Sequence, residues 1–369
     1  MNSRERFWRA FEHTEPDRVP ITELGIDLPH METITGRRYD GNVVVSTLTL
    51  EERGKENQLI ELMVECYRKL GFDMILGNVS TPEGWRPKTN PDGTIIDEWG
   101  RVLYNDPKCR KWIPGAKTIF KTPEEWEEFG IPDPNAPGRM ESLRYMEKLI
   151  KEEMVLAARI RDPFALLWEI FTPVKFVEWM YRRPSFIKEA FSKITRYNVE
   201  LIKLIAETGA ELIISGGDWC EKRGPMVPIR FFREVVFPHL KIQVDAAHKR
   251  GLKFIKHTDG NITPLLEYLV DIVDGIHSLD PSAGVDIGMV KEKYGERLVL
   301  MGNVSVDNLA LMSREAIKEE TKECIRRASP GGGHILSSSN SWYTNTKLEN
   351  CLTMVEVGRR YGTYPIRFR

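Results

Sequence analysis

The sequence predicts a TIM (β/α)₈ barrel that forms a single domain over residues 1–369. Three observations favour this fold class. Eight short β-rich segments alternate with helical patterns, and such a series favours a closed parallel barrel over two packed sheets. A chain of 369 residues accommodates a barrel of roughly 250 residues plus insertions. The segment ITELGIDLPH lacks the Gly-rich phosphate loop that the rival fold, a doubly wound open sheet, normally carries after its first strand.

The chain opens with a helical pattern over Ser3–His13 and a linker over Thr14–Arg18. The eight predicted strands are Val19–Leu24, Phe72–Asn78, Val155–Ile160, Glu211–Ser215, Leu252–His257, Gly275–Ser278, Leu298–Gly302 and Gly333–Ser337. Amphipathic helices are predicted between most of them, for example over Ile229–Arg250, Ser313–Ala328 and Lys347–Tyr361.

One stretch, Gly84–Thr118, falls outside this alternation. Within it, Thr94–Trp99 and Arg101–Tyr104 flank Gly100, which is typical of a β-hairpin. We expect this insertion, at about residues 84–118, to lie above or beside the barrel mouth.

Composition excludes several classes of protein. The net charge of −1 gives no overall attraction to nucleic acid or to anionic lipid. Five cysteines without a CxxC pair favour free thiols in a reducing compartment. The N-terminal segment MNSRERFWRAFEHTEPDR has no signal-peptide core, and no apolar run approaches the roughly 18 residues of a membrane helix. We therefore expect a soluble, cytoplasmic protein.

Active sites of such barrels lie at the C-terminal ends of the strands, so polar residues at predicted strand ends are the candidates. They are Glu23, Asn78, Arg159, Arg161, Asp218, Cys220, Glu221, His257, Asp259, His277, Asp280, Asn303, and Ser337 to Asn340.

The segment KFIKHTDGN carries the most information. In an extended backbone, His257 and Asp259 point to the same side. An imidazole and a carboxylate placed in this way bind a divalent metal with ligands from neighbouring strand ends, or act as a general base and its partner. The structural alternative is that His257 caps the strand and Asp259 shapes the turn at Gly260-Asn261.

Other candidates have weaker signals. Glu23 interrupts an apolar strand, where a carboxylate is costly unless it is paired or exposed at a mouth. Asp218 follows a Gly-Gly turn and is expected to face the site, whereas His277 is equally compatible with a satisfied interior histidine. Arg159 and Arg161 suit a carboxylate or a phosphate, although arginines near strand ends are often structural.

Several stretches resemble the uroporphyrinogen decarboxylase superfamily, which includes the decarboxylase and zinc-dependent corrinoid or coenzyme M methyltransferases. They are RERFWRAFEHTEPDRVPI, RRPSFIKEAFSKITRYNVELIKLIAETGAELI, GPMVPIRFFREVVFPHLKIQVDAAHKRGLKFIKHTDGNITPLL, PGGGHILSSSNS and LENCLTMVEVGRRYG. The resemblance covers nearly the whole chain in the right order, and it implies the TIM barrel independently of the strand pattern.

The sequence departs from both branches of this superfamily. The decarboxylases resemble one another in an MRQAGRY-like segment after the first strand, where this chain has TELGIDLPHMETITGRRYDG. The zinc methyltransferases look like HxC after strand five plus a later Cys. This chain keeps the histidine as His257 but has Asp259 in place of the first Cys, and no thiolate near Ser339-Asn340. A metal site would therefore use the harder ligands Glu23, His257 and Asp259.

Three interpretations follow. The first is a methyltransferase that moves a methyl group from a small donor, such as a methoxylated aromatic, to a corrinoid on a partner protein. The second is a decarboxylase acting on a tetrapyrrole, with Asp73 or Asp218 at a protonated pyrrole and Arg159 or Arg161 binding acetates. The third is a non-catalytic member that binds a corrinoid, a tetrapyrrole or a partner protein.

The first interpretation assigns roles to individual residues. Zinc or another divalent metal is expected, and because barrels of this family often form dimers the resemblance admits a homodimer. The predicted catalytic residues are His257, Asp259, Asp218 and Glu23, and the predicted substrate-binding residues are Asn78, Trp219, His277, Asn340 and Arg159. Trp219 and Trp342 are expected to line an apolar pocket.

Overall fold

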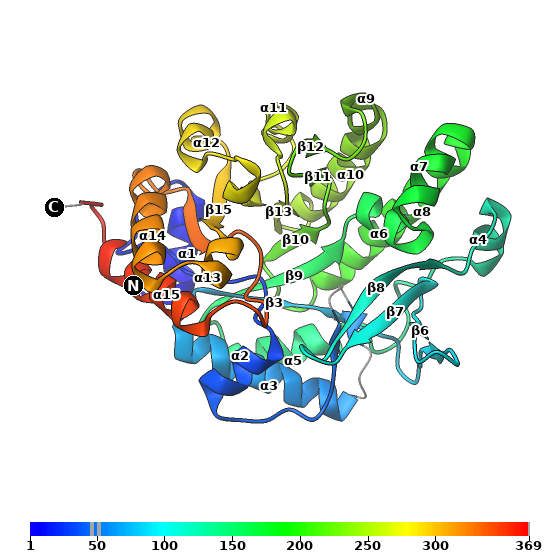
Figure 1. Cartoon of the computed structure of the whole chain (residues 1–369), viewed down its shortest axis with the longest axis horizontal. Helices are drawn as coiled ribbons and strands as arrows, with labels where there is room; N and C mark the ends of the chain where they lie inside the picture. The colour runs from blue at the N-terminus through cyan, green and yellow to red at the C-terminus, as the bar shows by residue number, and fades with distance from the viewer. Residues whose placement is uncertain (45–47, 50–52, 368–369) are drawn as a thin grey trace.

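The fold is a TIM-like α/β barrel, seen in a computed structural model that describes residues 1–44, 48–49 and 53–367 (Figure 1). Seven parallel strands form one curved sheet in the order β16-β15-β14-β13-β10-β9-β3. Their bounds are β3 (Met74–Gly77), β9 (Val155–Arg161), β10 (Leu212–Gly216), β13 (Lys253–Thr258), β14 (Gly275–Ser278), β15 (Val299–Val304) and β16 (His334–Ser338). Seven of the eight predicted strands are thereby confirmed, with ends within two residues of those expected.

The prediction of a regular strand over Val19–Leu24 is wrong. The segment nevertheless lies between the two edge strands of the sheet, β16 and β3. Ile21 makes an isolated parallel bridge with Leu336 of β16, and its carbonyl accepts a hydrogen bond of 2.9 Å from the N–H of Asp73, just ahead of β3. A full ladder does not form because Pro20 has no N–H and because the N–H of Ile21 donates to the Asp73 carboxylate at 2.8 Å.

The barrel interior is apolar at its N-terminal end. Alternate residues of the strands point inward, as a period of two requires. The buried inward cluster comprises Phe7, Phe11, Leu24, Met74, Leu76, Val155, Ala157, Leu212, Ile214, Ile255, Val299, Met301 and Ile335. Phe7 and Phe11 belong to α1 (Ser3–Phe11), the predicted N-terminal helix, so this helix plugs the bottom of the barrel. The open end is therefore the C-terminal one.

Asp73 holds the N-terminal segment to the barrel. Its carboxylate is fully buried and forms ion pairs with Arg6 (2.7 Å) and Arg18 (2.9 Å). Asp73 precedes β3 at the plugged end of the barrel, so the sequence-based role of this residue at a protonated pyrrole is wrong. The position is structural.

We expect Asp73→Asn to lower the free energy of unfolding by about 3–5 kcal/mol, because it leaves two buried or half-buried cations facing a neutral amide. Urea unfolding measures this change. Asp17→Asn is the matched control, because Asp17 also binds Arg6 but its side chain is 43% exposed. Its cost should stay within about 1 kcal/mol. Equal losses in the two variants would contradict the structural role of Asp73.

The predicted hairpin is confirmed and belongs to a larger antiparallel sheet. β6 (Ile95–Ile96) pairs with β7 (Arg101–Asp106), as expected. The sheet continues in the order β1-β8-β7-β6-β5, where β8 is Lys111–Thr118, β1 is Val43–Val44 and β5 is Lys88–Thr89. Figure 1 shows β7 and β8 beside the barrel, where they pack against α6 (Pro163–Phe171).

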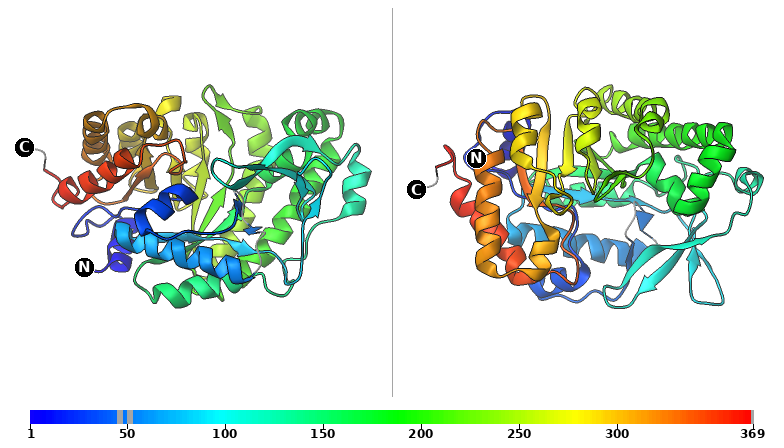
Figure 2. Two further views of the ribbon diagram at one scale, coloured as in Figure 1. Left: turned by 60° about the horizontal axis from the view of Figure 1, so that its bottom comes forward. Right: turned by 45° about the horizontal axis from the view of Figure 1, so that its top comes forward.

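Helices cover the outside of the strands (Figure 2). Three predicted helices are confirmed. The range Ile229–Arg250 contains α9 and α10, which a π-helical turn at Phe232–Val236 joins. The range Ser313–Ala328 corresponds to α14, and Lys347–Tyr361 corresponds to α15. The helices are α2 (Leu28–Thr35), α3 (Arg53–Leu70), α4 (Pro123–Phe129), α5 (Glu141–Ile150), α7 (Pro173–Arg182), α8 (Pro184–Ile205), α9 (Ile229–Phe231), α10 (Phe237–His248), α11 (Leu266–Leu269), α12 (Ile287–Tyr294), α13 (Val306–Leu311), α14 (Arg314–Ala328) and α15 (Leu348–Tyr361). Two further short pairings join β2 (Leu48–Thr49) to β4 (Val79–Ser80) and β11 (Cys220–Glu221) to β12 (Gly224–Pro225).

Two expectations from composition can be compared with the structure. All five cysteines are free, as predicted, and all five are buried. Across residues 1–44, 48–49 and 53–367, no helix combines the length and apolar character needed to cross a membrane.

Candidate active site

The inward rows of side chains change from apolar to polar at the C-terminal end of the barrel. On β3 the row of Met74 and Leu76 continues to Asn78, and on β9 the row of Val155 and Ala157 continues to Arg159. On β13 the row of Ile255 continues to His257. The same period that builds the core thus presents polar groups at the open end.

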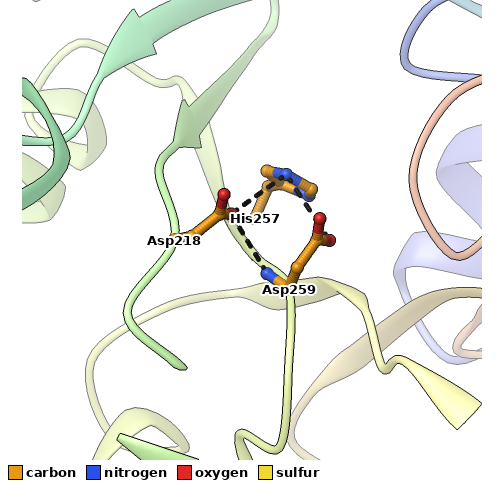
Figure 3. Close-up of side chains that lie close together, drawn as sticks. All are labelled: Asp218, His257 and Asp259. Atoms are coloured by element: carbon orange, nitrogen blue, oxygen red, sulfur yellow. Dashed lines mark hydrogen bonds and ion pairs between the residues drawn. The ribbon is translucent and has the colours of Figure 1, made fainter. Parts of the chain in front are cut away.

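Asp218, His257 and Asp259 meet at this end (Figure 3). The Nε2 atom of His257 lies 3.9 Å from Asp218 Oδ1 and 3.9 Å from Asp259 Oδ1. The side chains are 13%, 35% and 29% exposed for His257, Asp218 and Asp259, so the cluster is reached from solvent but not immersed in it. We call these three residues the DHD cluster.

Neighbouring loops hold the DHD cluster together. Trp219 N donates to Thr258 Oγ1 at 2.9 Å, and Asp259 N donates to Asp218 Oδ1 at 3.3 Å. Gly260 has φ of +79° and lies against the backbone of Cys220, where an added Cβ would come within 2.6 Å of the carbonyl oxygen. Only glycine allows this close approach, which brings Asp218 beside Asp259.

A chain of hydrogen bonds fixes the tautomer of His257. The Ser337 hydroxyl donates to Ser338 O at 2.8 Å, so it accepts from His277 Nε2 at 3.2 Å. A neutral His277 then accepts at Nδ1, which lies 2.7 Å from His257 Nδ1. His257 therefore carries its proton on Nδ1 and presents an unprotonated Nε2 to the two carboxylates. The register pair His257↔His277 of β13 and β14 explains this contact.

The electrostatics agree with a neutral imidazole. Burial, together with the cations of Lys256, Arg159 and Arg161, holds the pKa of His257 well below its usual range. Burial and the contact with His257 likewise hold the pKa of His277 well below its usual range. Burial and the adjacent Asp218 carboxylate raise the pKa of Asp259 well above its usual range. Two carboxylates beside an imidazole lone pair thus repel each other unless a proton or a cation lies between them.

The donor set of the DHD cluster fits a divalent metal. One oxygen or nitrogen from each residue lies within 4.8 Å of the others. Asp259 Oδ1 is buried without a hydrogen-bond partner among the described residues, whereas Oδ2 accepts from Asn340. His277 acts on His257 as the outer partner that metal-bound histidines usually have. An imidazole and carboxylates are ligands that suit Zn²⁺ or a harder divalent ion.

A cavity of about 170 Å³ adjoins the DHD cluster through His257 and Asn340. Barrel residues, α2, α3 and the antiparallel sheet all contribute to its walls. Polar groups in the lining include Asn42, Asn78, Lys111, Arg159, Arg161 and Tyr343, and apolar groups include Ile26, Met31, Leu59, Met63, Leu76 and Ile214. Of the predicted substrate-binding residues, Asn78, Arg159 and Asn340 line this cavity.

Glu23 lies apart from the DHD cluster, although it was predicted with His257 and Asp259 as a metal ligand. Its fully buried carboxylate accepts from the N–H of Ser338 and from its neighbour Leu24, each at 3.1 Å. The cluster of potential metal ligands found in the described residues uses Asp218 in its place. Burial raises the pKa of Glu23 to about 8.

Because of this raised pKa, the contribution of Glu23 to folding stability depends on pH. The folded protein keeps the proton up to about pH 8, whereas the unfolded chain releases it near the ordinary value of 4.5. Folding stability from this group is therefore complete below pH 4.5 and declines as pH rises to about 8, by an amount on the order of 5 kcal/mol. We expect the stability of Glu23→Gln relative to wild type to rise across this interval. A constant difference from pH 5 to 8 in urea unfolding would contradict the assignment.

Trp219, which was predicted to bind substrate, does not line the cavity. It is fully buried outside the cavity, its indole N–H donates to Asp162 at 2.9 Å, and its ring packs 4.3 Å from the Lys256 ammonium. Trp342 is also buried, packed edge-on against Phe72. Tyr67 and Tyr343 line the cavity in their place. His277 lies behind His257 rather than in the cavity wall, so any contact with substrate is indirect.

The sequence did not predict the cavity-lining residues that come from outside the barrel strands. Lys111, on β8, and Met63 and Tyr67, on α3, are separated from the barrel strands in sequence, and their own segments carry no signal that points to the mouth. Arg161, in contrast, follows from the period of two on β9, which places it on the same face as Arg159.

A barrel plugged at one end, with a polar cluster and a cavity at the other, defines a TIM-barrel protein whose site lies in the position used by enzymes of this class. The chain belongs to the uroporphyrinogen decarboxylase family, whose model, uroporphyrinogen decarboxylase (URO-D), matches residues 111–361. Its resemblance to an enzyme superfamily, expected from the sequence, is thereby confirmed.

Individual relatives are distant. The chain is 23% identical to uroporphyrinogen decarboxylase of Carboxydothermus hydrogenoformans over 81% of either chain. It is 23% identical to that of Hordeum vulgare, over 82% of this chain and 87% of the relative. Among solved structures, a methyltransferase from Methanosarcina mazei superposes with a TM-score of 0.73 at 18% identity and covers 98% of this chain and 99% of that one. This last likeness establishes the fold.

Proposed function

We propose that this protein is a methyltransferase that moves a methyl group from a small methyl donor, such as a methoxylated aromatic, to a corrinoid carried by a partner protein. The observation that carries the proposal is the DHD cluster, in which an unprotonated imidazole nitrogen and two carboxylates converge beside a partly open cavity. The family includes zinc-dependent methyltransferases by the resemblance described above, and the relative from Methanosarcina mazei is described as a methyltransferase.

Asp218, His257 and Asp259 would hold the metal. A bound divalent ion supplies Lewis acidity, which polarises the ether oxygen of a donor and weakens its bond to the methyl carbon. With nitrogen and oxygen ligands in place of thiolates, the cluster suits an oxygen-bearing donor better than a thiol.

The residues of the chain then have separate tasks. Asn340 orients Asp259 by donating to its Oδ2, and His277 holds His257 in the required tautomer. The cavity walls position the donor. In the net reaction the methyl group leaves the ether oxygen as a methyl cation equivalent, and the Co(I) corrinoid is its nucleophile and becomes methyl-Co(III). The donor oxygen takes one proton and becomes a hydroxyl group.

The test is product analysis with zinc-loaded protein, para-methoxybenzoate and cob(I)alamin. We expect one para-hydroxybenzoate for each methylcobalamin formed. Release of the hydroxy acid without methylation of cobalamin would indicate hydrolysis and contradict the proposal. Absence of both products across a panel of methoxylated and N-methylated donors would also overturn it.

Decarboxylation is the second candidate, because Arg159 and Arg161 in the cavity wall and a raised pKa at Asp259 suit a carboxylated substrate and a proton donor. The curated relatives named above carry this activity in their names. Coproporphyrinogen formation from uroporphyrinogen, with no methyl transfer, would favour this candidate.

A further inference from the structure

The cavity beside the DHD cluster carries an excess of positive charge. The described side chains in its wall include three cations, Lys111, Arg159 and Arg161, and a single carboxylate, Asp27. Asp27 binds Lys111 and also accepts from Thr344 N at 2.8 Å. An anionic group in the cavity would therefore meet a complementary field.

The two arginines lie side by side on β9. Arg159 and Arg161 occupy inward positions two residues apart, and Arg159 Nη2 donates to the carbonyl of Leu24 at 3.2 Å, which holds its guanidinium in the wall. Arg161 contacts Glu169, but the other oxygen of that carboxylate binds Arg101 at 2.7 Å. Arg101 also binds Asp97 at 2.6 Å, so two carboxylates serve these two guanidinium groups. Burial, together with the proximity of Arg161, lowers the pKa of Arg159 to about 10, and a bound anion would stabilise its charged form.

One polar atom beside Arg159 has no hydrogen-bond partner among the described residues. Asn78, one residue beyond β3, lines the same cavity, and its Oδ1 is buried with no hydrogen-bond partner among the described residues. The pairing of Gly77 with Ala158 places this amide next to Arg159. A ligand with polar substituents would satisfy it.

The wall also contains apolar side chains, and the space is small. Leu59, Met63 and Ile214 offer surface to a hydrocarbon body. An apolar cavity of about 150 Å³ is enough to bind benzene, so the 170 Å³ found here suits one substituted ring.

We propose that the cavity binds a single-ring aromatic carboxylate, with the carboxylate on Arg159 and Arg161. This inference rests on the proposed function, in which that ring compound is the methyl donor. Guanidinium groups bind carboxylates with charge-assisted, often bidentate hydrogen bonds, so the anionic end is what the site recognises. The specificity-determining residue is Arg159.

The test compares para-methoxybenzoate with its neutral amide by calorimetric titration of the full-length, zinc-loaded protein. We expect the acid to bind about tenfold more tightly or better, and Arg159→Met to remove most of this preference while amide binding persists. Arg159→Lys should keep part of the preference, which separates a lost charge from a misfolded variant. Lys117→Met is the matched control, because Lys117 is 71% exposed on β8, the strand that carries Lys111.

Equal binding of acid and amide, or an unchanged preference in Arg159→Met, would overturn this inference. The methyl-transfer assay separates it from the proposed function. Tight acid binding without any methyl transfer would overturn the function alone, whereas transfer from the amide but not from the acid would overturn the carboxylate site alone.

Discussion

Purified His257→Ala protein is expected to contain no stoichiometric divalent metal, whereas the wild type should bind about one zinc equivalent. His257 supplies the nitrogen of the DHD cluster, and its loss leaves Asp218 and Asp259 as the remaining ligands. Replacement of an outer-shell partner alone costs about 10–100-fold in metal affinity, so loss of a direct ligand should exceed this range. Methyl transfer should fall with it, by about 10³-fold or more. Elemental analysis and a chelator-competition titration measure the affinity.

His248→Ala is the matched control. His248 lies at the end of α10, where its Nε2 contacts Asp274 at 2.8 Å, away from the DHD cluster. This variant should bind metal like the wild type. Retention of full metal affinity in His257→Ala would show that the ion, if any, binds elsewhere.

A second large effect is expected from His277→Leu. The change removes the acceptor for the His257 Nδ1 proton, so the proton is no longer held away from Nε2. We expect zinc affinity to fall about 10–100-fold. The pH dependence of zinc binding should also change, because the tautomer that binds metal is no longer the favoured one.

His277→Gln distinguishes this positioning role from simple packing. A glutamine amide both accepts and donates, so it can take over the contacts to His257 and Ser337. Zinc affinity should recover at least in part in this variant. If His277→Leu lowers thermal stability but leaves zinc affinity and its pH profile unchanged, the residue is structural only.

Much of the barrel was predictable because its strands obey local rules. The predicted strand Leu298–Gly302, for example, is a short apolar run between two helices. The period of two in strands and of 3.6 in helices distinguishes such segments well. The apolar pattern of Val19–Leu24 is that of a strand, but the N–H of Ile21 donates to the side chain of Asp73, which lies far away in sequence. A local pattern does not show such a long-range contact.

The site was predictable to the extent that it follows strand ends. His257 and Asp259 were brought together by their two-residue spacing, and Asp218 joined them because β10 and β13 are neighbours in the barrel. Glu23 and Trp219 were misplaced for one reason: a residue type near a strand end does not reveal which way its side chain points. Lys111 was beyond prediction, because the sheet that carries it reaches the cavity only through tertiary packing.

The central claim, metal-dependent methyl transfer at the DHD cluster, is tested most directly by the absorbance of cob(I)alamin. Wild-type protein should convert it to methylcobalamin with a methoxylated aromatic acid when zinc is bound, should stop when zinc is chelated, and should resume when zinc is restored. His257→Ala should remain inactive under all three conditions. Conversion that is equally fast in the chelated wild type or in His257→Ala would contradict the account.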